Sequence, residues 1–344
     1  MRHSNIHPPR RPVAVCVAAT VFMCCGTLCR GDTGRPPANA ELDSVREWLW
    51  SNPPDGINRA ERRNRMCVIQ KAADRFPARN MFSYVALWIL SPETADEYEN
   101  DGILYYLKTS TDHAVEDISR TRVAEGLALW HIYNMGYVFK TPEVCFAIDI
   151  CLRDGQRIVD ELDFLLITHE HADHHAGGLA RAMIKAGKPV VSRFGPGSMI
   201  VDGPREFRFG PVRVKVDIGD HSPRHPSGRN NMLMFQVDCG ESASGCVIYH
   251  SGDGANYRKM TPDKPVDVFI PHVACSGMSV AKAIRHIDPS ITFVSHVMEL
   301  THGRTGSRWS YDYAYDAVGG LPDSEVAVLT WGERWLFPGT VLDD

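Results

Sequence analysis

The segment LLITHEHADHHAGG, residues 165–178, places four histidines, a glutamate and an aspartate directly behind an apolar run. A lone histidine is usually a surface residue or a hydrogen-bonded core residue, but four histidines within residues 169–175 are not explained in that way. Imidazole is the commonest protein ligand for transition metals, so this density of histidine indicates a site for divalent cations. The fold must therefore present this segment at the end of a buried element.

The spacing of these polar residues favours a strand that ends in a metal-binding loop. Residues 165–167 read as the end of a buried strand. His169 and His171 are two positions apart, so in an extended segment they point to the same side. Asp173 and His174 follow where the chain turns into a predicted helix, so one loop can offer two ligands to each of two metals. The zinc-protease pattern His-Glu-x-x-His is excluded because position 173 is an aspartate.

Short strand-like runs dominate the chain from about residue 126 onwards. The runs CFAIDIC, FLLIT, VRVKVDI, MLMFQVDC and CVIYHSGD are separated by turn-forming residues and predict strands. In YNMGYVFKT, Asn134 and Gly136 are expected to form a turn. GGLARAMIKAG and SVAKAIRHI predict helices between the strands. Strand pairs with interspersed helices favour a layered α/β sandwich.

Residues 169–174, His-Glu-His-Ala-Asp-His, fit the His-x-His-x-Asp-His motif and resemble the metallo-β-lactamase superfamily. Asp149 in CFAIDIC is similar to that family's early strand-end aspartate. Asp253 in IYHSGD is similar to its metal-bridging aspartate, and His296 in ITFVSHVMEL to its late strand-end histidine. Four features in the family's order, over residues 126–344, are not expected by chance. The resemblance implies an α/β fold, an αββα sandwich with metals at one edge of the two sheets. The spacing of apolar residues ahead of it predicts an N-terminal helical extension.

The resemblance also implies two metal ions with divided ligands. His169, His171 and a third histidine would hold one metal, and Asp173, His174 and His296 the other, with Asp253 between them.

Two residues compete for the place of the third histidine. His221 ends the strand in VRVKVDIGDHS, where a ligand is expected. His225 begins HPSGRNNMLMFQV, which resembles a variant of lactonase-like members. We favour His221 and keep His225 as the alternative.

This ligand set suits zinc, with manganese or iron as alternatives, because it is rich in nitrogen and carboxylate and has no thiolate. Two such metals would activate a shared water as a metal-bound hydroxide. Asp173 is expected to orient it, and His272 and His302 are candidates for proton transfer, with a structural hydrogen-bonding role as the alternative. We expect Asp149 to support a ligand rather than bind metal. Glu299 reads either as part of an acid/base cluster on one helical face with His296 and His302 or as a loop-holding hydrogen-bond acceptor.

The chain is therefore expected to be an exported hydrolase of a phosphodiester, lactone or related ester. Within the superfamily it resembles the ascorbate-6-phosphate lactonase-like and phospholipase-D-like branch. The alternatives are a mononuclear iron dioxygenase of the same fold and a non-catalytic binding protein. The expected partner is a small-molecule or lipid-like ester. Nucleic acid is not expected, because the net charge is −5.

The N-terminus has the pattern of an export signal. Basic residues precede the apolar run 13–29, so residues 1–31 predict a signal peptide that makes the protein periplasmic or secreted. A membrane anchor is the alternative, and membrane contact is expected only if this segment is retained or lipidated. Residues 32–125 predict a mainly helical region that serves as a cap or scaffold, and residues 126–344 predict the sandwich domain.

Six cysteines follow the predicted signal peptide. Cys239 and Cys246 flank GESASG, a segment that favours a hairpin loop, so they are expected to face each other and form a disulfide in an exported protein. Cys145 and Cys151 share one strand and are too far apart to bond each other, so they are expected in the core.

Overall fold

The computed structural model describes residues 37–54, 58–76, 101–151, 155–302, 308–322 and 325–343. The predicted signal peptide, residues 1–31, lies outside the described residues. The chain from Pro36 to Asp344 forms one compact unit. Among the described helices, none has the length and apolar content needed to cross a membrane.

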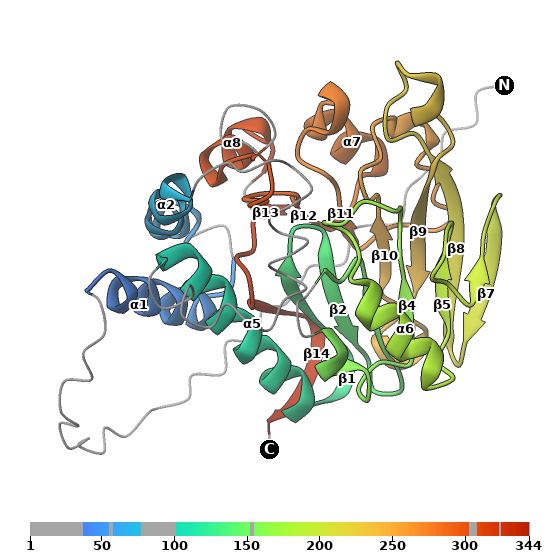
Figure 1. Ribbon diagram of the computed structural model, residues 1–344, viewed down its shortest axis with the longest axis horizontal. Helices are drawn as coiled ribbons and strands as arrows, with labels where there is room; N and C mark the ends of the chain where they lie inside the picture. Colours follow the sequence, from blue (N-terminus) through green and yellow to red (C-terminus); the bar gives the residue numbers. More distant parts are fainter. Residues whose placement is uncertain are drawn as a thin grey trace, which may run out of the picture. The chain divides into compact units, whose positions relative to one another are not determined.

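Two seven-stranded sheets lie against each other (Figure 1). One sheet has the order β14 (Arg334–Asp343), β1 (Thr121–Tyr133), β2 (Gly136–Lys140), β3 (Cys145–Ile148), β4 (Phe164–Leu166), β5 (Val190–Ser192) and β6 (Met199–Ile200). The other has the order β13 (Val326–Ala327), β12 (Ile291–Phe293), β11 (Val268–Ile270), β10 (Val247–His250), β9 (Met232–Asp238), β8 (Val212–Gly219) and β7 (Arg205–Phe209). In each sheet, antiparallel strands lead into four parallel strands, β3 to β6 and β10 to β13.

Helices complete the sandwich on the outer faces. The connections between parallel strands contain α6 (Gly177–Lys185), α7 (Val280–Ile287) and α8 (Tyr311–Ala317). Ahead of the first strand come α1 (Pro37–Ser51), α2 (Arg59–Arg75) and α5 (Gly102–Arg120). The expected αββα sandwich is confirmed. The strand β1 follows α5 directly and begins before the predicted boundary at residue 126.

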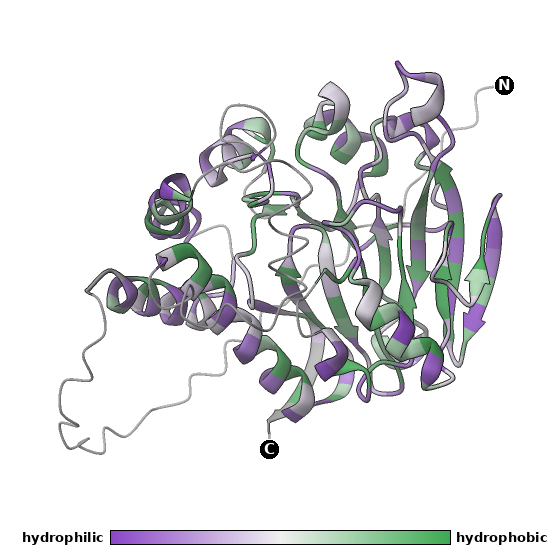
Figure 2. Cartoon of the chain, in the orientation of Figure 1, coloured by the Kyte–Doolittle hydropathy of each residue, from purple (hydrophilic) through white to green (hydrophobic). Residues whose placement is uncertain are grey.

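Strand alternation creates two separate apolar cores. Leu127 and Leu129 enter the core between the sheets, whereas Ala128 and Trp130 enter the core beneath the helices. This division follows from the two-residue period of a β-strand. Figure 2 shows the strands as the most hydrophobic part of the fold, with polar residues on the outer faces of the helices.

An aromatic stack crosses the inter-sheet core. The rings of Phe139, Phe146 and Phe164 stack with successive centroid distances of 4.9 Å and 4.9 Å. Phe209 of the opposite sheet continues the stack at 4.2 Å from Phe164. These contacts join β2, β3 and β4, the three strands that precede the metal-binding loop, to the second sheet. They therefore support the edge where that loop begins.

A buried ion pair ties the N-terminal helices to the sandwich. Arg62 of α2 lies 2.6 Å from the carboxylate of Glu333, and both side chains are almost fully buried. Arg62 also donates to the carbonyls of Leu49 and Asn52, and Glu333 accepts the backbone N–H of Thr330. The helical extension is therefore anchored at the turn before β14, beside the sandwich rather than on a separate tether.

Removing this arginine should destabilise the protein strongly. We expect Arg62→Met to lower the free energy of unfolding by about 3–5 kcal/mol, because it leaves the Glu333 carboxylate buried without its partner. Arg65→Met is the matched control, since Arg65 of the same helix pairs with Glu61 at the surface and lies over the ring of Trp48. A surface pair of this kind is worth about 0–1 kcal/mol. Urea unfolding measures both changes. Equal midpoints for the two variants would contradict the anchoring role.

The expected disulfide between Cys239 and Cys246 is wrong, because both are free, buried thiols. The backbone N–H of Cys239 donates to the carbonyl of Cys246 at 2.9 Å, so the two residues face each other as expected. Burial and the contact with the Cys239 side chain raise the pKa of the Cys246 thiol well above its usual range, which disfavours the thiolate that disulfide formation requires. Cys145 and Cys151 lie in the core, as expected.

Candidate metal centre

The predicted ligands converge at one edge of the sandwich because each follows the carboxyl end of a strand. The motif loop follows β4, His221 follows β8, Asp253 follows β10 and His296 follows β12. In α/β sheets, binding sites form outside the carboxyl ends of the strands. Gly252 permits the close approach of β10, since a Cβ there would lie 2.8 Å from Thr168 and its φ is +48°.

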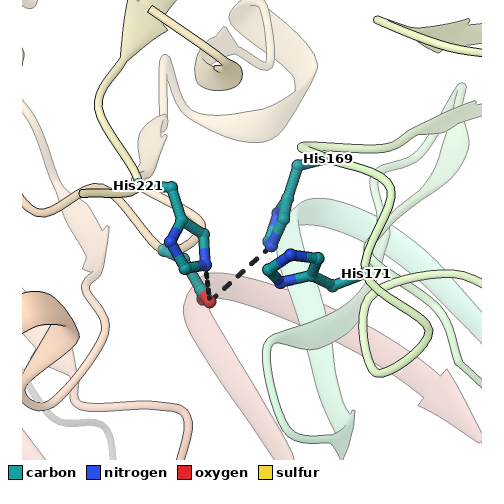
Figure 3. Close-up of side chains that lie close together, drawn as sticks. His169, His171 and His221 are labelled. Atoms are coloured by element: carbon teal, nitrogen blue, oxygen red, sulfur yellow. Dashed lines mark ion pairs between the residues drawn. The ribbon is translucent and has the colours of Figure 1, made fainter. Parts of the chain in front are cut away.

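The first ligand group contains three histidines and one aspartate. Potential ligand atoms of His169, His171, His221 and Asp253 lie within 4.8 Å of one another. Figure 3 shows the three imidazoles pointing toward one another. The Nε2 atom of His221 is 3.2 Å and that of His169 is 3.7 Å from Oδ2 of Asp253.

The second group shares Asp253 with the first. Potential ligand atoms of His174, His296 and Asp253 again lie within 4.8 Å of one another. Nε2 of His174 is 3.1 Å from Oδ1 of Asp253, and Nε2 of His296 is 3.2 Å from Oδ2 of Asp173. Oδ1 of Asp253 thus lies nearest His174, whereas Oδ2 lies near His221 and His169 of the first group and 3.9 Å from Nε2 of His296 of the second. One carboxylate therefore reaches both groups, as a bridging ligand would.

The hydrogen bonding of these residues fits metal ions. The Nε2 atoms of His169 and His174 and the Oδ1 atom of Asp253 are buried and make no hydrogen bond. Buried polar atoms without partners are rare and costly in folded proteins. A nitrogen- and carboxylate-rich donor set is also the set that zinc, manganese and iron accept. The residues therefore fit divalent metal ions that would take the unused lone pairs.

Asp149 sets the orientation of two of these imidazoles. Its buried carboxylate accepts the backbone N–H and the hydroxyl of Thr168, at 2.8 and 2.7 Å, and Nδ1 of His174 at 2.9 Å. The Thr168 hydroxyl, which donates to Asp149, accepts from Nδ1 of His169 at 3.0 Å. Each ring therefore carries its proton on Nδ1 and turns Nε2 toward the metal centre. These hydrogen bonds are the ones that the supporting role proposed for Asp149 requires.

Replacing Asp149 should weaken metal binding without removing a ligand. We expect Asp149→Asn to lower metal affinity about 10- to 100-fold, because the amide no longer specifies the Nδ1–H form of His174. Competition with a chromophoric chelator measures the affinity. Glu170→Gln is the control, because Glu170 is an exposed carboxylate in the same loop. If the two variants bind metal equally well, the orienting role of Asp149 is wrong.

Electrostatics keep the carboxylates ionised. Burial alone would raise the pKa of Asp253, but His174, His296 and His272 outweigh it and hold that pKa well below the usual range. Burial lowers the pKa of His169, and the neighbouring His174 adds to the effect. Burial also lowers the pKa of His171. These groups are therefore in the protonation states that metal ligands need near neutral pH.

His174 and His296 are the exceptions among the ligand histidines. Burial opposes the protonation of His174, but the carboxylates of Asp253, Asp173 and Asp149 outweigh burial and raise the pKa of His174 well above the ordinary value. Asp253 and Asp173 likewise outweigh burial and raise the pKa of His296. A proton on Nε2 of His174 would occupy the position of a metal, so protons and metal ions compete at this residue.

The structure separates the two candidates for the third histidine. His221 belongs to the first ligand group. His225 is exposed at the start of a short 3-10 turn, Pro226–Gly228, and belongs to no ligand group among the described residues. We therefore propose His221 as the ligand.

The pair supplies its own matched control. We expect His221→Ala to lower the metal content of the purified protein by about one ion per chain, because the first group is left with two imidazoles and one shared carboxylate. His225→Ala should keep the full metal content. Elemental analysis of the two variants side by side decides between them, and metal loss only in His225→Ala would reverse the assignment.

Glu299 holds the loop after β12. Its buried carboxylate accepts the hydroxyl of Tyr133 and the backbone N–H of His302, both at 2.9 Å. No helix forms over residues 294–302, so the expectation that His296, Glu299 and His302 share one helical face is wrong. His302 nevertheless reaches the centre, since it forms a further group of potential ligands with Asp173 and His296.

His272 lies beside the second group as a hydrogen-bond donor. Its ring stacks on that of His296 with a centroid distance of 4.0 Å, and its Nδ1 accepts the backbone N–H of Ala274 at 2.8 Å. Burial lowers the pKa of His272, so the ring is neutral and its proton lies on Nε2. Although Asp253, His272 and Cys275 also form a group of potential ligands, a protonated Nε2 cannot bind metal.

Asn134 has a role that its sequence context did not indicate. It adopts a φ of +56° in the β1–β2 turn, as a turn-forming residue does. Its side-chain amide also donates to the backbone oxygen and Oδ2 of Asp173, both at 3.1 Å. Its carbonyl accepts the backbone N–H of His296 at 3.3 Å. One turn residue therefore supports two members of the second ligand group.

Comparison with known families agrees with this geometry. Residues 135–293 match the family model described as the Beta-lactamase superfamily domain. This part of the chain belongs to the β-lactamase superfamily. The match runs from the β1–β2 turn to the end of β12, so it includes every proposed ligand except His296.

Solved structures share the metallo-β-lactamase fold at low sequence identity. A possible metal-dependent hydrolase from Veillonella parvula is 14% identical, with a TM-score of 0.50, over 62% of this chain and 100% of that chain. Igni18, a metallo hydrolase from Ignicoccus hospitalis, is 15% identical, with a TM-score of 0.49, over 62% and 99%. CmlA, a diiron β-hydroxylase from Streptomyces venezuelae, is 14% identical, with a TM-score of 0.46, over 62% and 54%. At this identity the first of these structures, with a TM-score of 0.50, indicates a shared fold and nothing more. No curated protein matches the chain.

Proposed function

We propose that the protein is a hydrolase that binds two divalent metal ions, most suitably zinc, and cleaves a phosphodiester, lactone or related ester. The observation that carries this proposal is the pair of ligand groups that share Asp253. The buried, unpartnered Nε2 atoms of His169 and His174 support it. A single metal would leave one of the two groups unused, so the arrangement favours two ions over the one expected for a mononuclear dioxygenase.

The bound metals would supply an activated water and polarise the ester group. Asp173 is the carboxylate best placed to orient the attacking water, because its Oδ2 is held by Asn134 and His296. The Nε2–H of His272 supplies a fixed donor for the oxygen that gains negative charge during the attack. His302, held at its backbone N–H by Glu299, is the residue proposed for proton transfer to the leaving group.

The cellular location, the substrate class and the place of the chain within the superfamily are part of the same proposal. We infer export from residues 1–31 and an ester substrate that is a small or lipid-like molecule. The branch that contains ascorbate-6-phosphate lactonase-like and phospholipase-D-like members is the proposed place of the chain within the superfamily.

Metal content and hydrolysis together test the function. We expect two zinc or manganese ions per chain and measurable cleavage of at least one of bis(p-nitrophenyl) phosphate, a γ-lactone or p-nitrophenyl acetate. Asp253→Asn should lose at least one ion and reduce hydrolysis more than roughly 100-fold, because it removes the ligand shared by both groups. Glu170→Gln, the exposed carboxylate variant of the same loop, should keep both properties.

Other outcomes point to the alternatives. One iron per chain with oxygen consumption would identify a dioxygenase. Two metals with no cleavage of any phosphodiester, lactone, ester or β-lactam would favour a non-catalytic binding protein. Full metal content in Asp253→Asn would refute the bridging role.

A further inference from the structure

A cavity of about 530 Å³ lies between residues 273–280 and residues 309–317. The first segment joins β11 to the start of α7, and the second includes α8. Sites for small organic ligands commonly have volumes of about 300–1,000 Å³. The cavity is therefore large enough for part of an organic molecule, and the metal-centre residues do not line it.

Both walls of the cavity are anchored to segments that carry proposed ligands. The hydroxyl of Ser276 donates to the carbonyl of His221 at 2.8 Å. Val273 directly follows His272, whose ring stacks on His296. On the other wall, the carbonyl of Trp309 accepts the N–H of Met298 at 2.8 Å, just after His296. Both walls of the cavity are thus held to the loops after β8, β11 and β12 that carry His221, His272 and His296.

The lining selects against charge. None of the described residues that line the cavity has a charged side chain. Trp309 and Tyr313 contribute rings that stack with a centroid distance of 4.7 Å, and Val273 and Met278 contribute aliphatic surface. The hydroxyl of Ser279 does not cap α7, so it is available for one hydrogen bond. A phosphate or carboxylate would find no countercharge here, whereas an aryl or alkyl group would find apolar contacts.

Tyr313 supports a binding role independently. It is 41% exposed and is one of four large hydrophobic side chains that are exposed among the described residues. Its ring stacks on Trp309 and lies at the cavity, where a ligand would cover it. An apolar ligand in the cavity would remove this ring from water, which is favourable.

We propose that this cavity binds the neutral, apolar part of the ester substrate, an aryl group or short acyl chain, while the reacting group lies at the metal centre. This inference rests on the proposed hydrolase function and specifies its substrate class. It favours esters with a sizeable apolar part over small, wholly polar phosphodiesters.

Chain-length preference tests the proposal in the metal-loaded, full-length enzyme. We expect kcat/KM for p-nitrophenyl butyrate to exceed that for the acetate roughly tenfold, because two further methylene groups enter the cavity. Tyr313→Ala and Ala317→Phe should bring this ratio close to one while metal content stays unchanged. The first removes an aromatic wall, and the second fills the cavity. Trp335→Ala is the control for loss of an aromatic side chain, because Trp335 lies on β14 outside the cavity, and it should keep the preference.

A binding measurement separates this proposal from the hydrolase function. Neutral 1-naphthol, titrated by calorimetry, should bind the metal-loaded protein, bind Ala317→Phe at least tenfold more weakly, and bind Trp335→Ala like the unmodified protein. That result supports the cavity as the binding site even if no ester is cleaved. Absence of naphthol binding to the unmodified protein, or an unchanged length preference in both cavity variants, would overturn the proposal.

Discussion

The carboxylate of Asp149 is the point on which the metal centre depends. It lies where β3 ends, in a left-handed conformation with a φ of +52°, and is completely buried. Its two oxygens receive the N–H and hydroxyl of Thr168 and the Nδ1–H of His174. Through the Thr168 hydroxyl they also determine the orientation of His169. One buried anion thus connects the end of β3 to the end of β4 and orients two imidazoles before any metal binds.

The rest of the centre is assembled from loops whose backbone is itself constrained. His296 and Met298 have φ values of +60° and +62°, a region that non-glycine residues seldom occupy. Asn134, also at positive φ, accepts from His296 and donates to Asp173. Conformations of this kind persist only where the surrounding contacts require them. Here those contacts hold the second ligand group together, so local backbone strain is associated with precise placement of side chains.

The sequence predicted the sandwich, the motif loop and a set of candidate ligands that the structure brings together, because these depend on local pattern. Strand periodicity and the spacing of His169, His171 and His174 can be recognised in the amino-acid sequence without knowledge of distant contacts. The role of Asn134 could not be predicted, because its partners lie far away in the chain and its own signal is that of an ordinary turn. The pairing of Cys239 with Cys246 was misjudged for a related reason. Their facing positions were foreseeable from the hairpin, but their complete burial, which disfavours the reactive thiolate, was not.

The N-terminal helices explain why the candidate metal ligands could be predicted from the sequence but the proposed substrate cavity could not. Arg62 of α2 reaches Glu333 just before β14, and Arg63 pairs with Asp312 of α8. The helix α8 carries Tyr313 of the proposed substrate cavity. The helical extension therefore positions one wall of the cavity through contacts with parts of the chain that are remote in sequence. The proposed metal ligands lie at strand ends, which local pattern indicates, whereas the proposed substrate selectivity depends on how this particular extension packs against α8.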